Sequence, residues 1–205
     1  MSAVTPATGG FGSSSLGATT ARFARRNAWV LALWGLLGLL LAFTILIKPG
    51  WGAPQLTILA IAALPYAFAT AAQTMAVLVG GIDLSVAAMM TFTSVTAAVL
   101  MEGQSEEFGV VAVALILLMG LGLGAINGLS IVLTRVPDIV VTLAFFFIWE
   151  GAALMVLDAP GGSAAVWLRE LIIGPVGSFI VPAGIGNWLP KALLLLVVSL
   201  GVVWI

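Results

Sequence analysis

The sequence predicts an all-α, polytopic transmembrane helical bundle of about six spans, and three observations predict it. Hydrophobic residues make up 62% of the 205 residues and charged residues only 7%, against roughly 25% in soluble proteins. The mean hydropathy is +1.25. The apolar residues gather in runs of about 20, the length that crosses a hydrocarbon core of roughly 30 Å.

The charge and residue inventory excludes several classes of function. Seven basic and eight acidic residues leave a formal net charge of -1, so the chain has no basic surface for a nucleic acid. It has no cysteine and no histidine, which removes disulfides, thiolate nucleophiles, the usual zinc ligands and the commonest proton-transfer side chain. We therefore expect no nucleic-acid partner, no metal, no cofactor and no catalytic residue.

The N-terminal segment and the first apolar run differ sharply in composition. Residues 1–27 are rich in Ser, Thr, Gly and Ala and contain Arg22, Arg25 and Arg26 near their end, so we expect a mostly disordered tail. Residues 28–47 are uncharged and longer than the roughly 7–15 residues of a signal-peptide core. No A-x-A cleavage site follows, and we predict that this run is retained as the first span.

Turn residues separate the next four runs. The segment KPGWGAP predicts a turn at the membrane interface after the first span. The second and third spans are separated by a Gly-Gly pair, the third and fourth by the acidic loop EGQSEEFG, and the fourth and fifth by the basic turn TRVPD. The second to fifth spans are predicted over residues 56–79, 84–101, 110–133 and 139–157.

The C-terminal part is apolar but irregular. Residues 158–190 are rich in Gly and Pro, and we interpret them as an interfacial loop with one short helix around residues 166–173. A last apolar run covers residues 192–205, with no polar residue at its end. We therefore expect a transmembrane domain over residues 28–205 that is incomplete at its C-terminus, as the N-terminal part of a longer membrane protein.

The basic residues of short loops predict the topology, because such loops stay on the cytoplasmic side. With the arginines of the tail inside, the acidic loop at residues 102–109 falls outside and Arg135 falls inside. Lys48, Arg169 and Lys191 fall outside, against the rule. We predict a multi-pass protein with a cytoplasmic N-terminus.

The break between the second and third spans is the most informative segment. In VLVGGIDLSVAAMM, residues 77–90, Gly80 and Gly81 interrupt the apolar run and Asp83 lies two residues before Ser85. A charge in hydrocarbon costs roughly 2.5–3.5 kcal/mol, so we expect Asp83 at a helix end or facing a cavity. One interpretation is an N-cap of the third span. The other is that this cap also fixes a broken helix along a translocation path.

Polar and aromatic residues inside the spans also have two interpretations. Glu150 either reaches the outer interface or a neighbouring helix, or lines the outer mouth of a path. For Gln73, Asn127 and Thr142 we favour interhelical hydrogen bonds over a place on the path. The aromatic residues at 145–147, 149, 167, 188 and 204 are predicted to be lipid-facing or interfacial anchors.

The motif GGIDLSV at residues 80–86 closely resembles the signature of the permease subunits of bacterial ABC importers for ribose-type sugars. The block AINGLSIVLTRVPDIVVTLAFFFIWEGAAL, residues 125–154, resembles the block that follows in that family. The resemblance covers roughly residues 56–205 in order and spacing. It implies that the transmembrane domain over residues 28–205 is a permease domain of the bacterial inner membrane, which forms the path for a monosaccharide of the ribose or xylose type. The candidate pathway or helix-break residues are Gly80, Gly81, Asp83, Ser85, Asn127 and Glu150.

The resemblance also implies the partners: a cytoplasmic ATPase subunit, a periplasmic or lipid-anchored sugar-binding protein, a second permease copy and the lipid bilayer. The chain has no P-loop of the form GxxxxGK[ST], so we expect a transport subunit and not an enzyme. Two departures stand out: Glu150 lies where family members often have arginine, and the family's chains continue for several more spans. The alternative is a fragment of an ion-coupled secondary transporter that uses Asp83 and Glu150.

Overall fold

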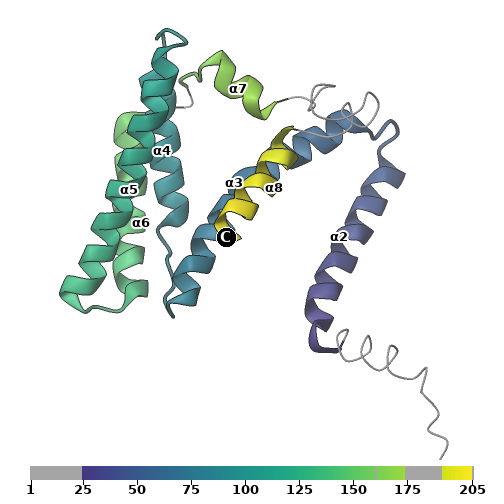
Figure 1. Cartoon of the computed structure of the whole chain (residues 1–205), viewed down its shortest axis with the longest axis horizontal. Coiled ribbons are helices and arrows are strands. Elements are labelled where there is room, and N and C mark those ends of the chain that lie inside the picture. The colour runs from purple at the N-terminus through teal and green to yellow at the C-terminus, as the bar shows by residue number, and fades with distance from the viewer. Residues whose placement is uncertain (1–24, 160, 174–190, 205) are drawn as a thin grey trace, which may run out of the picture. The chain divides into compact units, whose positions relative to one another are not determined.

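The computed structural model of the chain describes residues 25–159, 161–173 and 191–204, and over these residues its regular structure is helical. It divides into two compact units, Met1–Trp51 with α2 and Gly52–Ile205 with the other helices (Figure 1). Most of the predicted tail over residues 1–27 lies outside the described residues. The helices are α2 Ala28–Ile47, α3 Ala53–Leu78, α4 Val86–Met101, α5 Phe108–Thr134, α6 Asp138–Val156, α7 Val166–Ile172 and α8 Lys191–Trp204.

The predicted fold class is confirmed. Within the described ranges four helices are long and apolar enough to cross a membrane: α2 with 20 residues, α3 with 26, α5 with 27 and α6 with 19. α4 has 16 residues, or about 24 Å at 1.5 Å per residue, and α8 has 14. The predicted spans and the predicted short helix correspond in order to these elements, with ends that differ by only a few residues.

In the first unit, α2 is apolar on every side. None of its residues is buried, and large side chains such as Trp29 and Leu46 are mostly exposed within the chain. A helix that is hydrophobic all round is typical of a membrane span, because lipid solvates every face.

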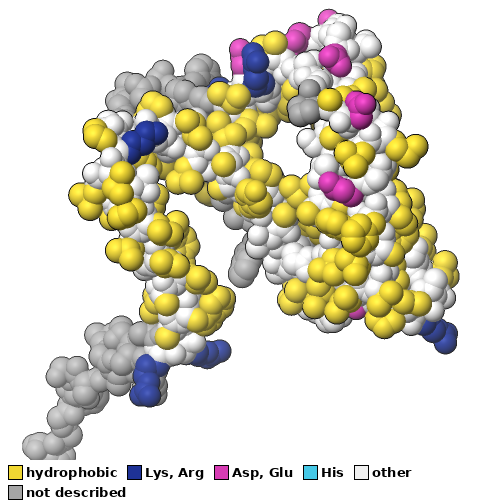
Figure 2. Space-filling view, turned by 180° about the vertical axis from the view of Figure 1, so that it is seen from behind, with side chains coloured by type: hydrophobic (Ala, Val, Ile, Leu, Met, Phe, Trp, Pro, Cys, Tyr) yellow, Lys and Arg dark blue, Asp and Glu magenta, His cyan; other side chains and the backbone are white. Residues whose placement is uncertain are grey.

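Three helices of the second unit, α4, α5 and α6, pack against one another. Several of their buried side chains are small or short, namely Ala88, Ala112, Thr142 and Ala153. Small residues let membrane helices approach closely. Figure 2 shows hydrophobic side chains along the lengths of these helices, with most of the visible acidic side chains towards one end.

The short helix α7 lies against the end of the bundle where α4 meets α5. The Glu106 carboxylate accepts the backbone N–H of Val166 at 2.7 Å, and the Trp167 indole donates to the Glu106 carbonyl at 3.1 Å. Gly109 allows this approach, because a Cβ there would lie 2.7 Å from the Cβ of Ala165. Elsewhere in this unit α3 packs against α8.

Candidate functional site

The helix break predicted between the second and third spans is present, and glycine shapes its first turn. α3 ends in a Schellman motif, in which the N–H of Gly80 donates to Val77 at 3.0 Å and the N–H of Gly81 to Ala76 at 2.9 Å. Gly80 has a φ of 85°, a left-handed conformation that favours glycine. The chain then runs without helical structure until α4 begins at Val86.

Two side chains of α6 hold the break segment, residues 79–85, in place. The Asp138 carboxylate accepts the N–H of Ile82, and Thr142 Oγ1 accepts the N–H of Leu84 at 3.1 Å. Asp138 and Thr142 are one helical turn apart and so share a face of α6. Backbone donors that leave a helix inside a membrane need such partners, since unsatisfied groups there cost several kcal/mol.

Gly81 fits between the break segment and α6 because it has no side chain. A Cβ at this position would lie 2.8 Å from Asp138 Oδ2, closer than carbon and oxygen approach without displacement. The Asp138 carboxylate is also held by its bond to Ile82. The two glycines of the motif therefore have different roles, one conformational and one steric.

Asp83 binds the start of α4 but is not its N-cap, so that prediction is wrong by two residues. Ser85 is the N-cap, and it makes no side-chain capping bond. Asp83 Oδ1 instead accepts the N–H of Ser85 at 2.8 Å and its hydroxyl at 2.6 Å. This is an Asx turn, in which the carboxylate orders the two residues before the helix.

A buried chain of hydrogen bonds connects this turn to α5 and α6. Asn127 Nδ2 donates to Ser85 Oγ at 2.6 Å, and Trp149 Nε1 donates to Asn127 Oδ1 at 3.2 Å. Ser85 is 0% exposed and Asn127 is 3% exposed, so water does not compete for these bonds. Asn127 and Thr142 thus bond between elements, as the sequence predicted.

Trp149 is the residue of this site that sequence reasoning missed. Its indole stacks with Phe92 and Phe145, with ring centroids 6.0 and 5.4 Å apart. The prediction that Trp149 is a lipid-facing or interfacial anchor is therefore wrong, because its indole packs against Phe92 of α4 and bonds to Asn127 of α5. The sequence contained a signal for its position, since Trp149 lies two turns from Thr142 and therefore on the same face of α6. Phe147, at 66% exposure, does face outward, and Trp188 lies outside the described residues.

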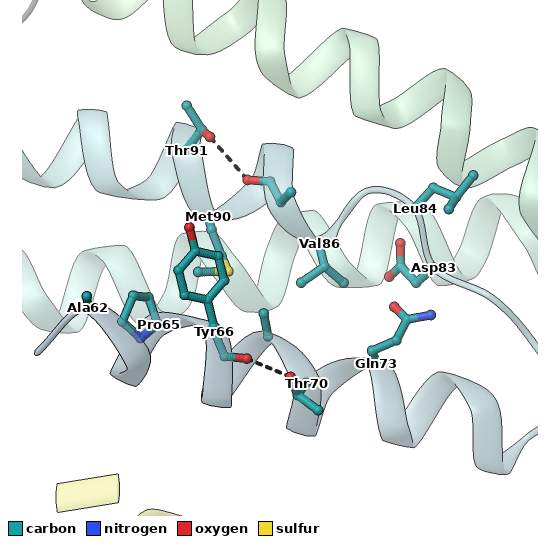
Figure 3. Close-up of a pocket in the computed structure, with 12 residues that line it drawn as sticks. Ala62, Pro65, Tyr66, Thr70, Gln73, Asp83, Leu84, Val86, Met90 and Thr91 are labelled. Atoms are coloured by element: carbon teal, nitrogen blue, oxygen red, sulfur yellow. Dashed lines mark hydrogen bonds between the residues drawn. The ribbon is translucent and has the colours of Figure 1, made fainter. Parts of the chain in front are cut away.

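Asp83 lies at the border of two cavities. One is an open groove of about 850 Å³ between α3 and the start of α4, where Figure 3 shows Gln73 and Asp83 pointing toward one another. The other, of about 420 Å³, lies between the break segment, α5 and α6. Four of the predicted residues line this second cavity, namely Gly80, Gly81, Asp83 and Asn127.

Glu150 is not brought to this site. It is half-buried on α6, and it lines neither of the two cavities around Asp83. Among the described residues none forms a hydrogen bond or ion pair with it. The structure therefore collects five of the six candidate residues around the break and leaves Glu150 separate.

The comparison with known proteins points to membrane transport. Over 88 residues the chain is 36% identical to the inner membrane ABC transporter permease protein YjfF of Escherichia coli strain K12. The match covers 42% of this chain and 25% of that permease. No family model and no solved structure matches the chain. The chain is thus a partial homologue of an ABC transporter permease, in agreement with the resemblance carried by its motifs.

Proposed function

We propose that the chain is a membrane-spanning permease subunit of an ATP-binding-cassette importer for a monosaccharide of the ribose or xylose type, and that it forms part of the translocation path. The similarity to an inner-membrane ABC permease is the observation that carries the proposal. The GGIDLSV motif supports the sugar class by its resemblance to ribose-type permeases.

The geometry of the break supports a place on the path. Non-helical backbone within a membrane is tolerated where protein covers it or where it lines a cavity. Here α6 satisfies the N–H groups of Ile82 and Leu84, while Asp83 between them lines two cavities. In many transporters, substrates bind at such interruptions of a helix.

The proposed partners follow from the proposed role. They are a cytoplasmic ATPase subunit, a periplasmic or lipid-anchored sugar-binding protein and a second permease copy, all within or against the bacterial inner membrane. ATP hydrolysis belongs to the separate subunit in this arrangement, and the binding protein supplies most of the sugar specificity.

Co-purification tests the permease assignment. The full open reading frame, carrying an affinity tag, is expressed together with the ABC-type ATPase encoded nearest to it and extracted in mild detergent. We expect the ATPase to co-elute in stoichiometric amount, and to be absent when an unrelated polytopic membrane protein carries the tag. A permease that elutes alone as a folded, monodisperse protein would contradict the proposal.

The second candidate, a fragment of an ion-coupled secondary transporter, is favoured by two carboxylates in or beside the spans. Glu150 has no partner among the described residues, and the same holds for the second oxygen of Asp83. Such groups can carry protons or Na⁺ in transporters. Solute uptake into liposomes that is driven by an ion gradient, with no ATPase present, would establish this function in place of the first.

A further inference from the structure

Two polar side chains face the groove between α3 and α4, and each has a hydrogen-bonding group that binds no other described residue. Gln73, a half-buried residue of α3, makes no side-chain hydrogen bond within the described part of the chain. Asp83 uses only Oδ1 to bind Ser85, which leaves Oδ2 unpaired among the described residues. Figure 3 shows both groups on the same stretch of the groove. Both groups are accessible from the groove, since no side-chain N or O atom in the described part of the chain is buried without a hydrogen-bond partner. A ligand in the groove can therefore bind both.

The Asp83 carboxylate is held in one orientation before any ligand arrives. The N–H and the hydroxyl of Ser85 both donate to Oδ1, and Asn127 fixes that hydroxyl from α5. Trp149 fixes Asn127 in turn. A ligand that binds the free oxygen therefore meets a pre-positioned acceptor, which lowers the entropy lost on binding.

The lining of the groove defines the chemistry of the ligand. The described residues that line it include no Lys or Arg, which disfavours phosphorylated or carboxylated solutes. Hydroxyls satisfy both partners, because a carboxylate only accepts hydrogen bonds whereas a carboxamide both donates and accepts. The ring of Tyr66 and the side chain of Pro65 supply apolar surface for the C–H faces of such a molecule. The volume of about 850 Å³ lies in the usual range for small-molecule sites.

A metal ion fits this groove less well. Hard cations take six to eight oxygen ligands or an octahedral shell, usually with several carboxylates. The groove has one carboxylate, and the described residues contain no group of three or more acidic, His or Cys side chains that could hold a metal.

We propose that Gln73 and Asp83 form a binding subsite for a neutral, hydroxyl-rich solute of monosaccharide size. Asp83 Oδ2 accepts a hydrogen bond from one hydroxyl of the solute, and the Gln73 carboxamide bonds to the adjacent hydroxyl. The ring of Tyr66 covers the apolar face of the solute. This inference rests on the proposed function, because it places the transported sugar in the groove of the permease.

The absence of cysteine from the chain makes a direct binding test possible. Ala87 lines the groove from α4 and is exposed, so the A87C variant places a single thiol beside the subsite. The rate of its modification by a water-soluble maleimide is measured in liposomes that contain the full-length protein, with D-ribose, D-xylose or NaCl added. The Q104C variant is the control, since Gln104 is exposed in the α4–α5 loop and lines neither cavity around Asp83.

We expect at least one of the two sugars to slow the modification of A87C by several-fold without affecting Q104C. Adding Q73L or D83N should raise the sugar concentration needed for protection by about tenfold or more, because each removes a hydrogen bond to the ligand. Q73L guards against misfolding as the explanation, because the Gln73 amide holds no other described residue in place.

Three outcomes overturn the subsite: no protection by either sugar, protection by NaCl alone, or protection that Q73L and D83N leave unchanged. The proposed function can be judged separately by co-purification with the ATPase. If the ATPase binds but sugar does not protect A87C, the groove assignment fails and the permease assignment stands. If sugar protects A87C but no ATPase binds, the subsite stands and the importer assignment fails.

Discussion

At the scale of single residues, Asn127 has the most demanding position in the described structure. It is almost fully buried on a membrane helix, and its amide both donates to Ser85 and accepts from Trp149. Hydrogen bonds between membrane helices contribute about 0.6–2 kcal/mol each, and an unsatisfied buried donor adds a further cost. Asn127 therefore couples α5 to α6 and to the break segment.

Replacing Asn127 with leucine should lower the free energy of unfolding by about 1–3 kcal/mol, because the indole N–H of Trp149 loses its acceptor. Unfolding of the purified protein by SDS in mixed micelles measures the change. The control is Ser130→Ala, since the Ser130 hydroxyl is exposed and bonds only to the Ile126 carbonyl of its own helix. Equal effects of the two substitutions would show that the buried hydrogen bonds of Asn127 contribute no more to the free energy of unfolding than an exposed hydrogen bond does.

Gly81→Ala tests the contact between the break segment and α6. The new methyl group would lie 2.8 Å from Asp138 Oδ2, so the carboxylate must move away from the N–H of Ile82. We expect a loss of about 1–3 kcal/mol in the same SDS unfolding assay. Gly120→Ala is the matched control: it lies within α5 with nothing within 4 Å of the added Cβ, and alanine favours a helix. If Gly81→Ala leaves the free energy of unfolding unchanged, the Asp138 carboxylate is not fixed against the break segment.

At the scale of elements, α6 determines the geometry of the break between α3 and α4. Asp138 at its start and Thr142 one turn later accept the N–H groups of Ile82 and Leu84. The side chain of Asp83, between these two residues, instead bonds to Ser85 and lines the groove.

Thr142→Val should expose the N–H of Leu84 to exchange with solvent. Removing its acceptor is worth about 1–1.5 kcal/mol, which corresponds to roughly tenfold faster amide exchange for Leu84. Hydrogen–deuterium exchange of the peptide spanning the break measures this rate. Thr91→Val is the comparison, because the Thr91 hydroxyl bonds to Ala87 of its own helix on an exposed face. An unchanged amide exchange rate at Leu84 would show that Thr142 does not hold this N–H.

The sequence predicted the elements better than the contacts between them. Apolar runs and Gly/Pro punctuation are local, so they located every helix from α2 to α8 within a few residues. The bonds of Ile82 and Leu84 join residues nearly 60 positions apart, and no local pattern encodes them. Asp83 was assigned to the N-cap for the same reason, because spacing alone does not distinguish a cap from an Asx turn that precedes it.

Trp149 shows a second limit of sequence reasoning in a membrane protein. Lipid and protein interior are both apolar, so hydrophobicity does not tell which face of α6 is buried. The polar residue Thr142 marked that face, and reading the helix from Thr142 by whole turns leads to Trp149 and Ala153.

At the scale of the whole molecule, the topology has a clear test. If the N-terminus is cytoplasmic, the α4–α5 loop is outside and the α5–α6 turn is inside, because α5 is long enough to separate them by a full membrane. A membrane-impermeant maleimide should label Q104C in intact cells and label V136C only after the cells are made permeable. The reverse pattern would invert the proposed orientation.

The proposed role of the protein is to conduct a sugar in response to ATP hydrolysis by a partner. ATP hydrolysis is therefore measured in liposomes that contain the full-length permease with its ATPase, in the presence of a binding protein with and without bound sugar. The proposed role predicts that the sugar-loaded binding protein raises hydrolysis several-fold over the empty one. Assembled complexes that hydrolyse ATP at the same rate with either form would contradict it.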